Sequence, residues 1–149
     1  MTPYDMIKAH LGTAVPFQNY VGVKLLDVSD GIASAELEQR DDISNHINSM
    51  HAGAMFTLGE AASGAAMAGA LAPEILQMRP VAAMGSIAFK KVAKGKLTAH
   101  AATSRPGTEL MQAIKNDGKV AFDVTVDIRN DADETVVEMT VNWYVSATR

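Results

Sequence analysis

Cysteine is absent from the 149-residue sequence, and aromatic residues are scarce, with a single tryptophan. Without cysteine the chain has no disulfide, no thiol nucleophile and no thiolate ligand for a metal ion. The formal net charge of -4 at pH 7 argues against nucleic acid as the main partner. The few aromatic rings also argue against a platform for stacked bases. The composition therefore indicates a globular protein that does not act on DNA or RNA.

A targeting segment and a membrane span are both disfavoured. The first residues, MTPYDMIKAH, lack a basic region followed by an apolar core, so we expect no signal peptide and a cytoplasmic protein. Residues 52–72 are long enough for a span, but fourteen of these twenty-one residues are Ala, Gly or Ser. Glu60 at the centre would be costly in lipid. A buried helix, with no membrane partner, is the better interpretation.

Local patterns predict one helix, two strands, one long helix and four strands, in that order. Thr2 and Pro3 form a typical helix start, and Gly12 is expected to end this peripheral helix (residues 1–12). The expected strands span residues 21–28, 32–40, 81–92, 97–104, 120–128 and 137–145, and the long helix spans 52–71. The long helix is apolar all round and has no polar face for an ordinary two-layer sandwich. We therefore expect one α+β domain, residues 1–149, in which a curved antiparallel sheet of five to six strands wraps the helix.

Polar residues gather immediately before the long helix. The segment Asn45-x-x-Asn48-x-x-His51-Ala52-Gly53-x6-Glu60-x3-Gly64, together with the order of elements, resembles hotdog-fold acyl-CoA thioesterases. The similarity is to the phenylacetate-degradation branch and its uncharacterised relatives, and it covers roughly residues 20–146. In that family glycine usually occupies the positions of Asn48 and Ala52, and many members have Asp at the position of Glu60. The resemblance implies a hotdog fold and hydrolysis of an acyl thioester.

Thioester hydrolysis needs a base or nucleophile and donors aimed at the developing oxyanion. A helix N-terminus offers unpaired N–H groups and a positive dipole end. The resemblance implies that Gly53 donates its N–H to the oxyanion, that Glu60 is the base or nucleophile, and that Asn45 and His51 support them. Gly53 and Glu60 lie about 10 Å apart along one helix. The resemblance therefore implies sites shared between two protomers of a homodimer, or of a dimer of dimers.

Further residues are expected at the substrate. The segment from residue 90 to 96 holds four of the thirteen basic residues, which would suit the phosphates of coenzyme A, although a solvated hairpin is an equal alternative. The candidates for substrate binding are Asn48, Ser63, Gly64, Lys90, Lys91 and Lys94. Coenzyme A would enter as part of the substrate, and neither a separate cofactor nor a metal is expected. The single His-Asn-His spacing near one Glu lacks the convergence that a metal site needs.

Three alternatives remain open. A hotdog dehydratase would pair His46 with Glu60, which lies fourteen residues later. A dimeric hotdog could also bind an acyl thioester without turnover. Glu60 could instead be structural, a buried carboxylate held by a hydrogen bond or an ion pair. Because burying an unpaired carboxylate is unfavourable, we expect Glu60 to have a partner in every case.

Overall fold

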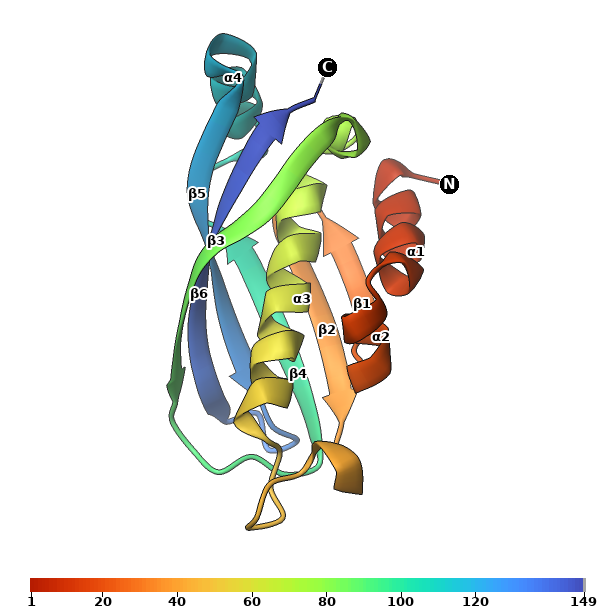
Figure 1. Ribbon diagram of the computed structural model, residues 1–149, viewed down its shortest axis with the longest axis vertical. Helices are drawn as coiled ribbons and strands as arrows, with labels where there is room; N and C mark the ends of the chain where they lie inside the picture. Colours follow the sequence, from red (N-terminus) through yellow and green to blue (C-terminus); the bar gives the residue numbers. More distant parts are fainter. Residues whose placement is uncertain (149) are drawn as a thin grey trace.

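The computed structural model describes residues 1–148, and one antiparallel sheet of six strands curves around a long helix (Figure 1). The strands follow one another across the sheet in the order β1-β2-β4-β5-β6-β3. Their bounds are β1 (Lys24–Ser29), β2 (Ile32–Glu38), β3 (Met78–Phe89), β4 (Lys96–Thr103), β5 (Lys119–Arg129) and β6 (Thr135–Ala147). The predicted architecture, a long helix wrapped by a curved antiparallel sheet, is confirmed.

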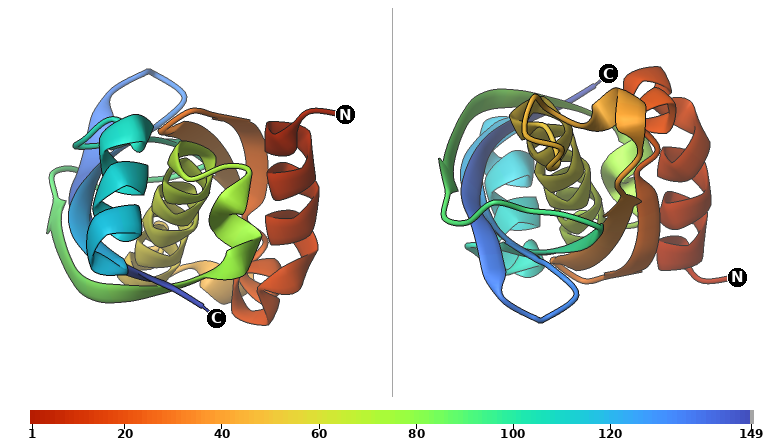
Figure 2. Two further views of the ribbon diagram at one scale, coloured as in Figure 1. Left: turned by 90° about the horizontal axis from the view of Figure 1, so that it is seen from above. Right: turned by 90° about the horizontal axis from the view of Figure 1, so that it is seen from below.

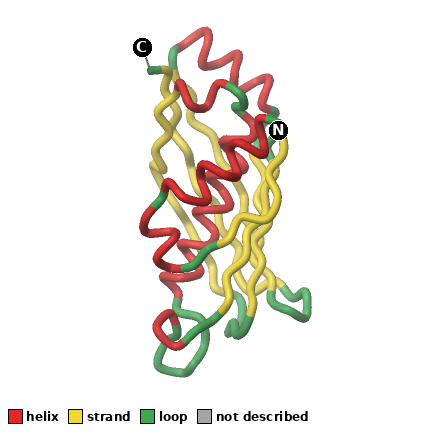
Figure 3. The backbone as a smooth tube through the Cα atoms, turned by 90° about the vertical axis from the view of Figure 1, so that its right-hand side faces the viewer, coloured by secondary structure: helices red, strands yellow, loops and turns green. Residues whose placement is uncertain are grey.

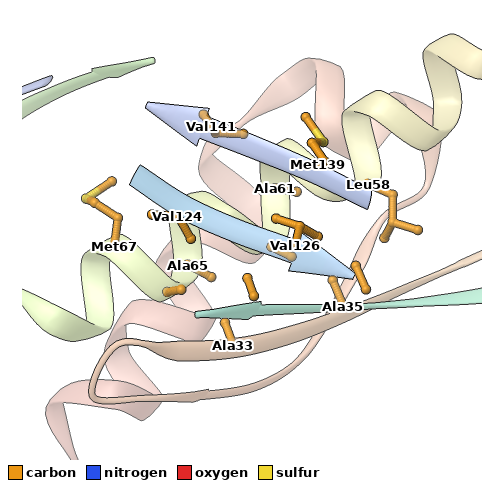
Figure 4. Packing of buried hydrophobic residues seen from close by; sticks show 14 of the residues in the cluster. Ala33, Ala35, Leu58, Ala61, Ala65, Met67, Val124, Val126, Met139 and Val141 are labelled. Carbon is orange, nitrogen blue, oxygen red and sulfur yellow. The ribbon is translucent and has the colours of Figure 1, made fainter. Parts of the chain in front are cut away.

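The central helix α3 (Ala52–Ala70) packs closely on the sheet because many of its residues are small. A Cβ atom on Gly59 would collide with Met139 of β6, and a Cβ on Gly69 would collide with the carbonyl of Ser29. Figure 4 shows the same close approach along the helix, with alanines between helix and sheet. The labelled buried residues are Ala33, Ala35, Leu58, Ala61, Ala65, Met67, Val124, Val126, Met139 and Val141. The many alanine and glycine residues of α3 thus allow a short distance between the helix and the sheet.

The alternating patterns of β5 and β6 place one apolar face on the helix. Val124 pairs with Val141 and Val126 pairs with Met139, so inward residues of the two strands lie side by side. All four are buried, whereas the intervening residues of β5 are mostly exposed. The strands predicted over residues 120–128 and 137–145 are therefore confirmed, each slightly longer than expected.

The N-terminal helix begins as predicted but does not end as predicted. In α1 (Pro3–Ala14) the Thr2 hydroxyl accepts from the Asp5 N–H at 3.1 Å, and the Asp5 carboxylate accepts from the Thr2 N–H at 3.0 Å. Gly12 does not end the helix. The chain leaves it at Val15, which is extended because it precedes Pro16, the first residue of the unpredicted helix α2 (Pro16–Val21). Proline, and not glycine, therefore sets this boundary.

A second helix, α4 (Gly107–Asp117), was also missed between β4 and β5. Its buried side chains Leu110 and Ile114 are four residues apart, and Gly118 caps it in the left-handed conformation at φ 77°. The short 3-10 helices η1 (Asp41–Ile43) and η2 (Glu74–Gln77) complete the chain. None of the helices in residues 1–148 is both long and apolar enough to cross a bilayer.

Although α3 is apolar all round, its own chain leaves one face of it uncovered. One face carries Gly53 and Phe56, which are exposed, and Glu60 and Gly64, which are half-buried. These residues recur every three or four positions and so form one stripe along the helix. Figure 1 shows no element in front of α3 between β3 and α1. The sheet covers the helix from behind, and the stripe of Gly53, Phe56, Glu60 and Gly64, the outward stripe, stays open.

Candidate active site

The loop before α3 is held together by the side chain of Asn45. Its Oδ1 accepts from the backbone N–H groups of Ile47 (3.1 Å) and Ser49 (3.0 Å), and its Nδ2 lies 2.8 Å from the Ser49 hydroxyl. The N–H of Met50 fastens the loop by donating to the carbonyl of Ala93 at 2.7 Å. Figure 3 shows this loop at the end of the molecule away from both termini. Asn45 therefore orients the loop, and its contact with a substrate stays a prediction.

Asn48 and Ala52, the two positions where the family usually has glycine, differ in backbone conformation. Asn48 has φ 57°, in the left-handed region that asparagine tolerates better than most other residues. Ala52 is the first residue of α3 and has a negative φ, so its position does not need glycine. Both departures from the family pattern are therefore compatible with the loop backbone. Neither of them distorts the helix start.

His51 caps the N-terminus of α3 through its own imidazole. Its Nδ1 accepts a hydrogen bond from the Gly53 N–H at 2.8 Å, and its carbonyl accepts from Ala54 and Met55. A Cβ atom on Gly53 would lie 3.1 Å from that Nδ1, so glycine leaves room for the imidazole. The Gly53 N–H, the expected oxyanion donor, is thus already bonded in this structure. An oxyanion at this N–H would have to replace the imidazole.

Glu60 is a half-buried carboxylate without a partner. Burial raises the pKa of its carboxyl above the ordinary value. Among residues 1–148 no side chain forms an ion pair with it, and no group donates a hydrogen bond to its carboxylate. The partner expected for Glu60 is therefore not supplied by residues 1–148 of its own chain, and that expectation stays a prediction. An unpaired carboxylate on an open face is unfavourable for folding and is available for chemistry.

Ser63 supports Trp143 and does not face the open stripe. Ser63 is fully buried; its hydroxyl donates to the Glu60 carbonyl at 2.7 Å and accepts from the Trp143 Nε1–H at 3.0 Å. The expectation that Ser63 contacts substrate is corrected accordingly. Gly64, one residue on, is half-buried, and a Cβ there would lie 3.3 Å from the Trp143 ring. Trp143 of β6 therefore lies beside Ser63 and Gly64 of α3.

A cavity of about 380 Å³ joins the loop to the end of β3. Asn45, Phe89, Lys90 and Lys91 are among its lining residues, so two sequence motifs more than forty residues apart meet here. Lys90 pairs with Glu138 at 3.4 Å and Lys91 pairs with Glu134 at 2.7 Å, both at the surface. Lys94 is exposed and does not line the cavity. Of the three lysines expected at the substrate, two thus lie beside the loop and one lies outside the cavity.

The remaining candidates are not brought together within one chain. Glu60 does not line the cavity at Asn45 and lies eight residues into α3, about 12 Å from its start. His46, the partner of Glu60 in the dehydratase alternative, is an exposed residue at the tip of the loop. Within residues 1–148 no three His, Asp or Glu side chains are grouped to hold a metal ion. The site of one chain is therefore in two parts, the loop and Glu60.

Many solved structures share the fold of this chain, although their sequences differ. A protein of unknown function and probable thioesterase from Pseudomonas aeruginosa superimposes with a TM-score of 0.83 at 20% identity, over 98% of this chain and 97% of that chain. The PaaI protein from the phenylacetic acid degradation operon of Escherichia coli gives 0.75 at 16% identity, over 99% and 97%. A hypothetical thioesterase from Streptococcus pneumoniae, solved with coenzyme A, gives 0.69 at 20% identity, over 90% and 95%. These likenesses show a shared fold, the hotdog fold.

No functionally curated protein has significant sequence similarity to this chain. One family model, described as "Domain of unknown function (DUF4442)", matches residues 4–145, which is nearly the whole chain. The chain therefore belongs to the DUF4442 family, and it shares the hotdog fold with the solved structures named above.

Proposed function

We propose that this protein hydrolyses an acyl-CoA thioester at sites shared between two copies of the chain. The observation that carries the proposal is the Glu60 carboxylate, half-buried on an open helix face and without a partner among residues 1–148. A carboxylate that only stabilised the fold would be paired. Its raised pKa also suits a base that works near neutral pH.

The open edge of the sheet supports a pair of chains. β3 pairs with β6 on one side and has no partner strand on the other among the described residues. Its side chains Val81 and Met84 are 42% and 70% exposed, and Phe56 on the outward stripe is 37% exposed. A long apolar edge strand is a natural pairing site for another strand. Pairing of two β3 strands would bring the second chain to the open face that holds Glu60.

The lysines beside the loop support coenzyme A as the group that carries the acyl chain. Lys90 and Lys91 flank the cavity at Asn45, and their surface ion pairs are weak enough to be exchanged for phosphate. The similar protein from Streptococcus pneumoniae was solved with coenzyme A. In the proposal the carrier lies at the loop of one chain, and its thioester reaches Glu60 of the other.

The proposed step is a hydrolysis with general base catalysis. Glu60 takes a proton from water as the water oxygen attacks the carbonyl carbon, and the N–H of Gly53 replaces its bond to His51 with one to the oxyanion. The C–S bond then breaks, and the proton passes to the sulfur of the leaving thiolate, giving an acid and free coenzyme A. In the alternative, Glu60 itself attacks the carbonyl, and water hydrolyses the resulting anhydride.

A mixing experiment tests the shared site. Neither Glu60→Gln nor Gly53→Val should release thiol from an acyl-CoA panel, because each variant lacks one half of every site. A mixture re-equilibrated into mixed dimers contains one intact site in each mixed dimer. We expect thiol release to reappear in the mixture. No recovery, in variants that both remain dimeric, would contradict a site built from two chains.

The hydrogen bond from Gly53 to His51 favours a second candidate, a dimeric protein that binds acyl thioesters without hydrolysing them. In this structure the imidazole occupies the donor that an oxyanion would need. Calorimetric titration with a panel of acyl-CoAs, combined with thiol detection on the same samples, separates the two functions. Saturable binding without thiol release would identify the binding protein.

A further inference from the structure

The side chain of Gln39 joins two segments that meet at the cavity beside the loop. Gln39 follows the last residue of β2. Its Nε2 donates to the Ser44 hydroxyl at 2.9 Å and to the Asn48 carbonyl at 3.1 Å. Its Oε1 accepts from the Gly95 N–H at 2.8 Å, and its own N–H donates to the Gly95 carbonyl at 3.0 Å. One side chain therefore bridges the loop before α3 and the segment of residues 90–96, the lysine segment.

The two segments lie at the same end of the molecule. Seen from below, the loop before α3 and the connection from β3 to β4 are both near the viewer (Figure 2). A backbone hydrogen bond from the Met50 N–H to the Ala93 carbonyl, at 2.7 Å, joins them at one point. A single hydrogen bond acts as a hinge, about which two segments can rotate. Gln39 supplies a second point of attachment, and two points fix the relative orientation of the segments.

Both attachment points of Gln39 are turns with a left-handed backbone. Asn48 has φ 57° and Gly95 has φ 78°. Few residues adopt this conformation without support, and the Gln39 amide binds a peptide group at each turn. The contact with Asn48 holds the loop between Asn45 and His51, and the contact with Gly95 holds the end of the lysine segment. Gln39 therefore stabilises the two turns together.

The Gln39 amide fits its surroundings in one orientation. Its two N–H donors face two acceptors, and its oxygen faces a donor, so every group has a partner. Turning the amide over would place its oxygen against the Asn48 carbonyl and its N–H groups against the Gly95 N–H. The side chain is half-buried, which strengthens these hydrogen bonds relative to those at an open surface. The site therefore requires a neutral amide and not a carboxylate.

Gln39 acts from behind the cavity. Asn45 and Ile47 from the loop, and Lys90 and Lys91 from the lysine segment, line this space, whereas Gln39 is not among the described residues that do so. A ligand that contacts both segments binds more tightly when they are held at the right separation before it arrives. The hydrogen bonds of Gln39 provide this preorganisation without contact with the ligand.

We propose that Gln39 is a positioning residue, which holds the loop and the lysine segment in the arrangement that binds the phosphate-bearing part of coenzyme A. This inference rests on the proposed function for the identity of the ligand. Gly53 and Glu60 belong to α3, whose position is set by its packing on the sheet. The hydrogen bonds of Gln39 therefore affect the binding of the carrier, and the chemical step proceeds at its usual rate once the substrate is bound.

Two substitutions of Gln39 and one control test this role. Gln39→Met keeps the length of the side chain and removes every hydrogen bond of the amide. Gln39→Glu is the milder change, because it keeps an acceptor for the Gly95 N–H and loses both donors to the loop. Gln112→Met is the matched control. Gln112 is an exposed glutamine of α4, at the other end of the molecule (Figure 1), and its Nε2 donates to the Asn116 Oδ1 at 3.0 Å.

Three measurements separate binding of the carrier from catalysis. Calorimetric titration with free coenzyme A measures binding without any reaction. Thiol release is then followed with the acyl-CoA of a panel that the wild type hydrolyses fastest. The same acyl group on N-acetylcysteamine gives a thioester without phosphates. Both Gln39→Met and Gln39→Glu should weaken coenzyme A binding, and raise KM for the acyl-CoA, at least about tenfold. We expect unchanged kcat, and unchanged kcat/KM for the N-acetylcysteamine thioester, while Gln112→Met matches the wild type throughout.

Each departure from this pattern has a definite meaning. A purely structural role of Gln39 would lower kcat for both substrates and leave KM unchanged, because fewer molecules would be folded, and this result would overturn the inference. Wild-type affinity for coenzyme A in both variants would overturn it as well, and thiol release by the wild type would then leave the thioesterase proposal intact. Weakened coenzyme A binding in both variants, with no thiol release from any protein, supports the role of Gln39 and contradicts the thioesterase proposal alone. No binding of coenzyme A by the wild type would overturn both.

Discussion

The imidazole Nδ1 of His51 accepts a hydrogen bond from the backbone N–H of Gly53 at 2.8 Å. This single contact caps the central helix and at the same time occupies the donor expected to hold an oxyanion. A helix N-terminus that is capped by a side chain is more stable and less able to bind an anion. The two uses of the Gly53 N–H therefore compete, and the imidazole has to move for catalysis.

The capping role of His51 predicts a loss of stability when the imidazole is removed. His51→Ala should lower the free energy of unfolding by about 1 kcal/mol, the usual loss when a helix N-cap is deleted. His51→Asn should retain most of the stability, since the Asn side chain can accept from the same N–H group. Urea denaturation at one fixed protein concentration measures both variants. Equal stability of His51→Ala and the wild type would show that the cap contributes nothing.

The raised pKa of Glu60 predicts how stability changes with pH. Because burial favours the protonated form, the contribution of Glu60 is fully present below its ordinary value of 4.5 and is lost as the pH rises through the folded-state pKa. Glu60→Gln, which cannot ionise, should therefore be more stable than the wild type at pH 8. The difference should shrink towards pH 4. A difference that does not vary with pH would contradict an unpaired, buried carboxylate.

The buried hydrogen bond between Trp143 and Ser63 predicts that Ser63 matters for folding and not for substrate affinity. Ser63→Ala leaves the Trp143 N–H without its acceptor, which costs about 1–3 kcal/mol. The unfolding midpoint should fall, and the fluorescence of this single tryptophan should shift. KM for an acyl-CoA should stay at the wild-type value. A raised KM with unchanged stability would restore Ser63 as a substrate contact.

The exposed edge strand predicts where the second chain binds. Met84→Lys places a charge on β3, so we expect the dissociation constant of the dimer to rise at least about tenfold, which corresponds to about 1.4 kcal/mol. Ile32→Lys is the matched control. Ile32 is 59% exposed, but it lies on β2, which is four strands away from β3 in the sheet. Sedimentation equilibrium measures both. Dimerisation that is unaffected by Met84→Lys would move the interface away from β3.

The sequence predicts the strands and the central helix because their patterns are strong and local. The alternation of Val124 and Val126 with polar residues needs no tertiary information, nor does the Thr2–Asp5 capping box. The helix α4 is harder to predict, since Leu110 and Ile114 give only one repeat of its buried face. The predicted end of α1 at Gly12 is wrong because glycine is tolerated inside an exposed helix, whereas Pro16, four residues later, starts the next helix.

The positions of the candidate residues on the loop and on α3 could be predicted, but their contacts could not. The spacing from Asn45 to Glu60 marks the loop and the helix, and the structure places both where the pattern implies. The spacing does not reveal that Ser63 turns inward to Trp143, or that the His51 imidazole folds back on Gly53, because both depend on side-chain directions set by packing. The absence of a partner for Glu60 likewise follows only from the three-dimensional surroundings.

Thiol release from a panel of acyl-CoAs by the wild type and by Glu60→Gln tests the central claim most directly. General base catalysis contributes about 10²- to 10⁴-fold, so kcat should fall at least about a hundredfold in Glu60→Gln. Glu38→Gln, which changes an exposed glutamate on β2, should leave kcat unchanged. A Glu60→Gln protein that is folded, dimeric and as active as the wild type would contradict the role assigned to Glu60.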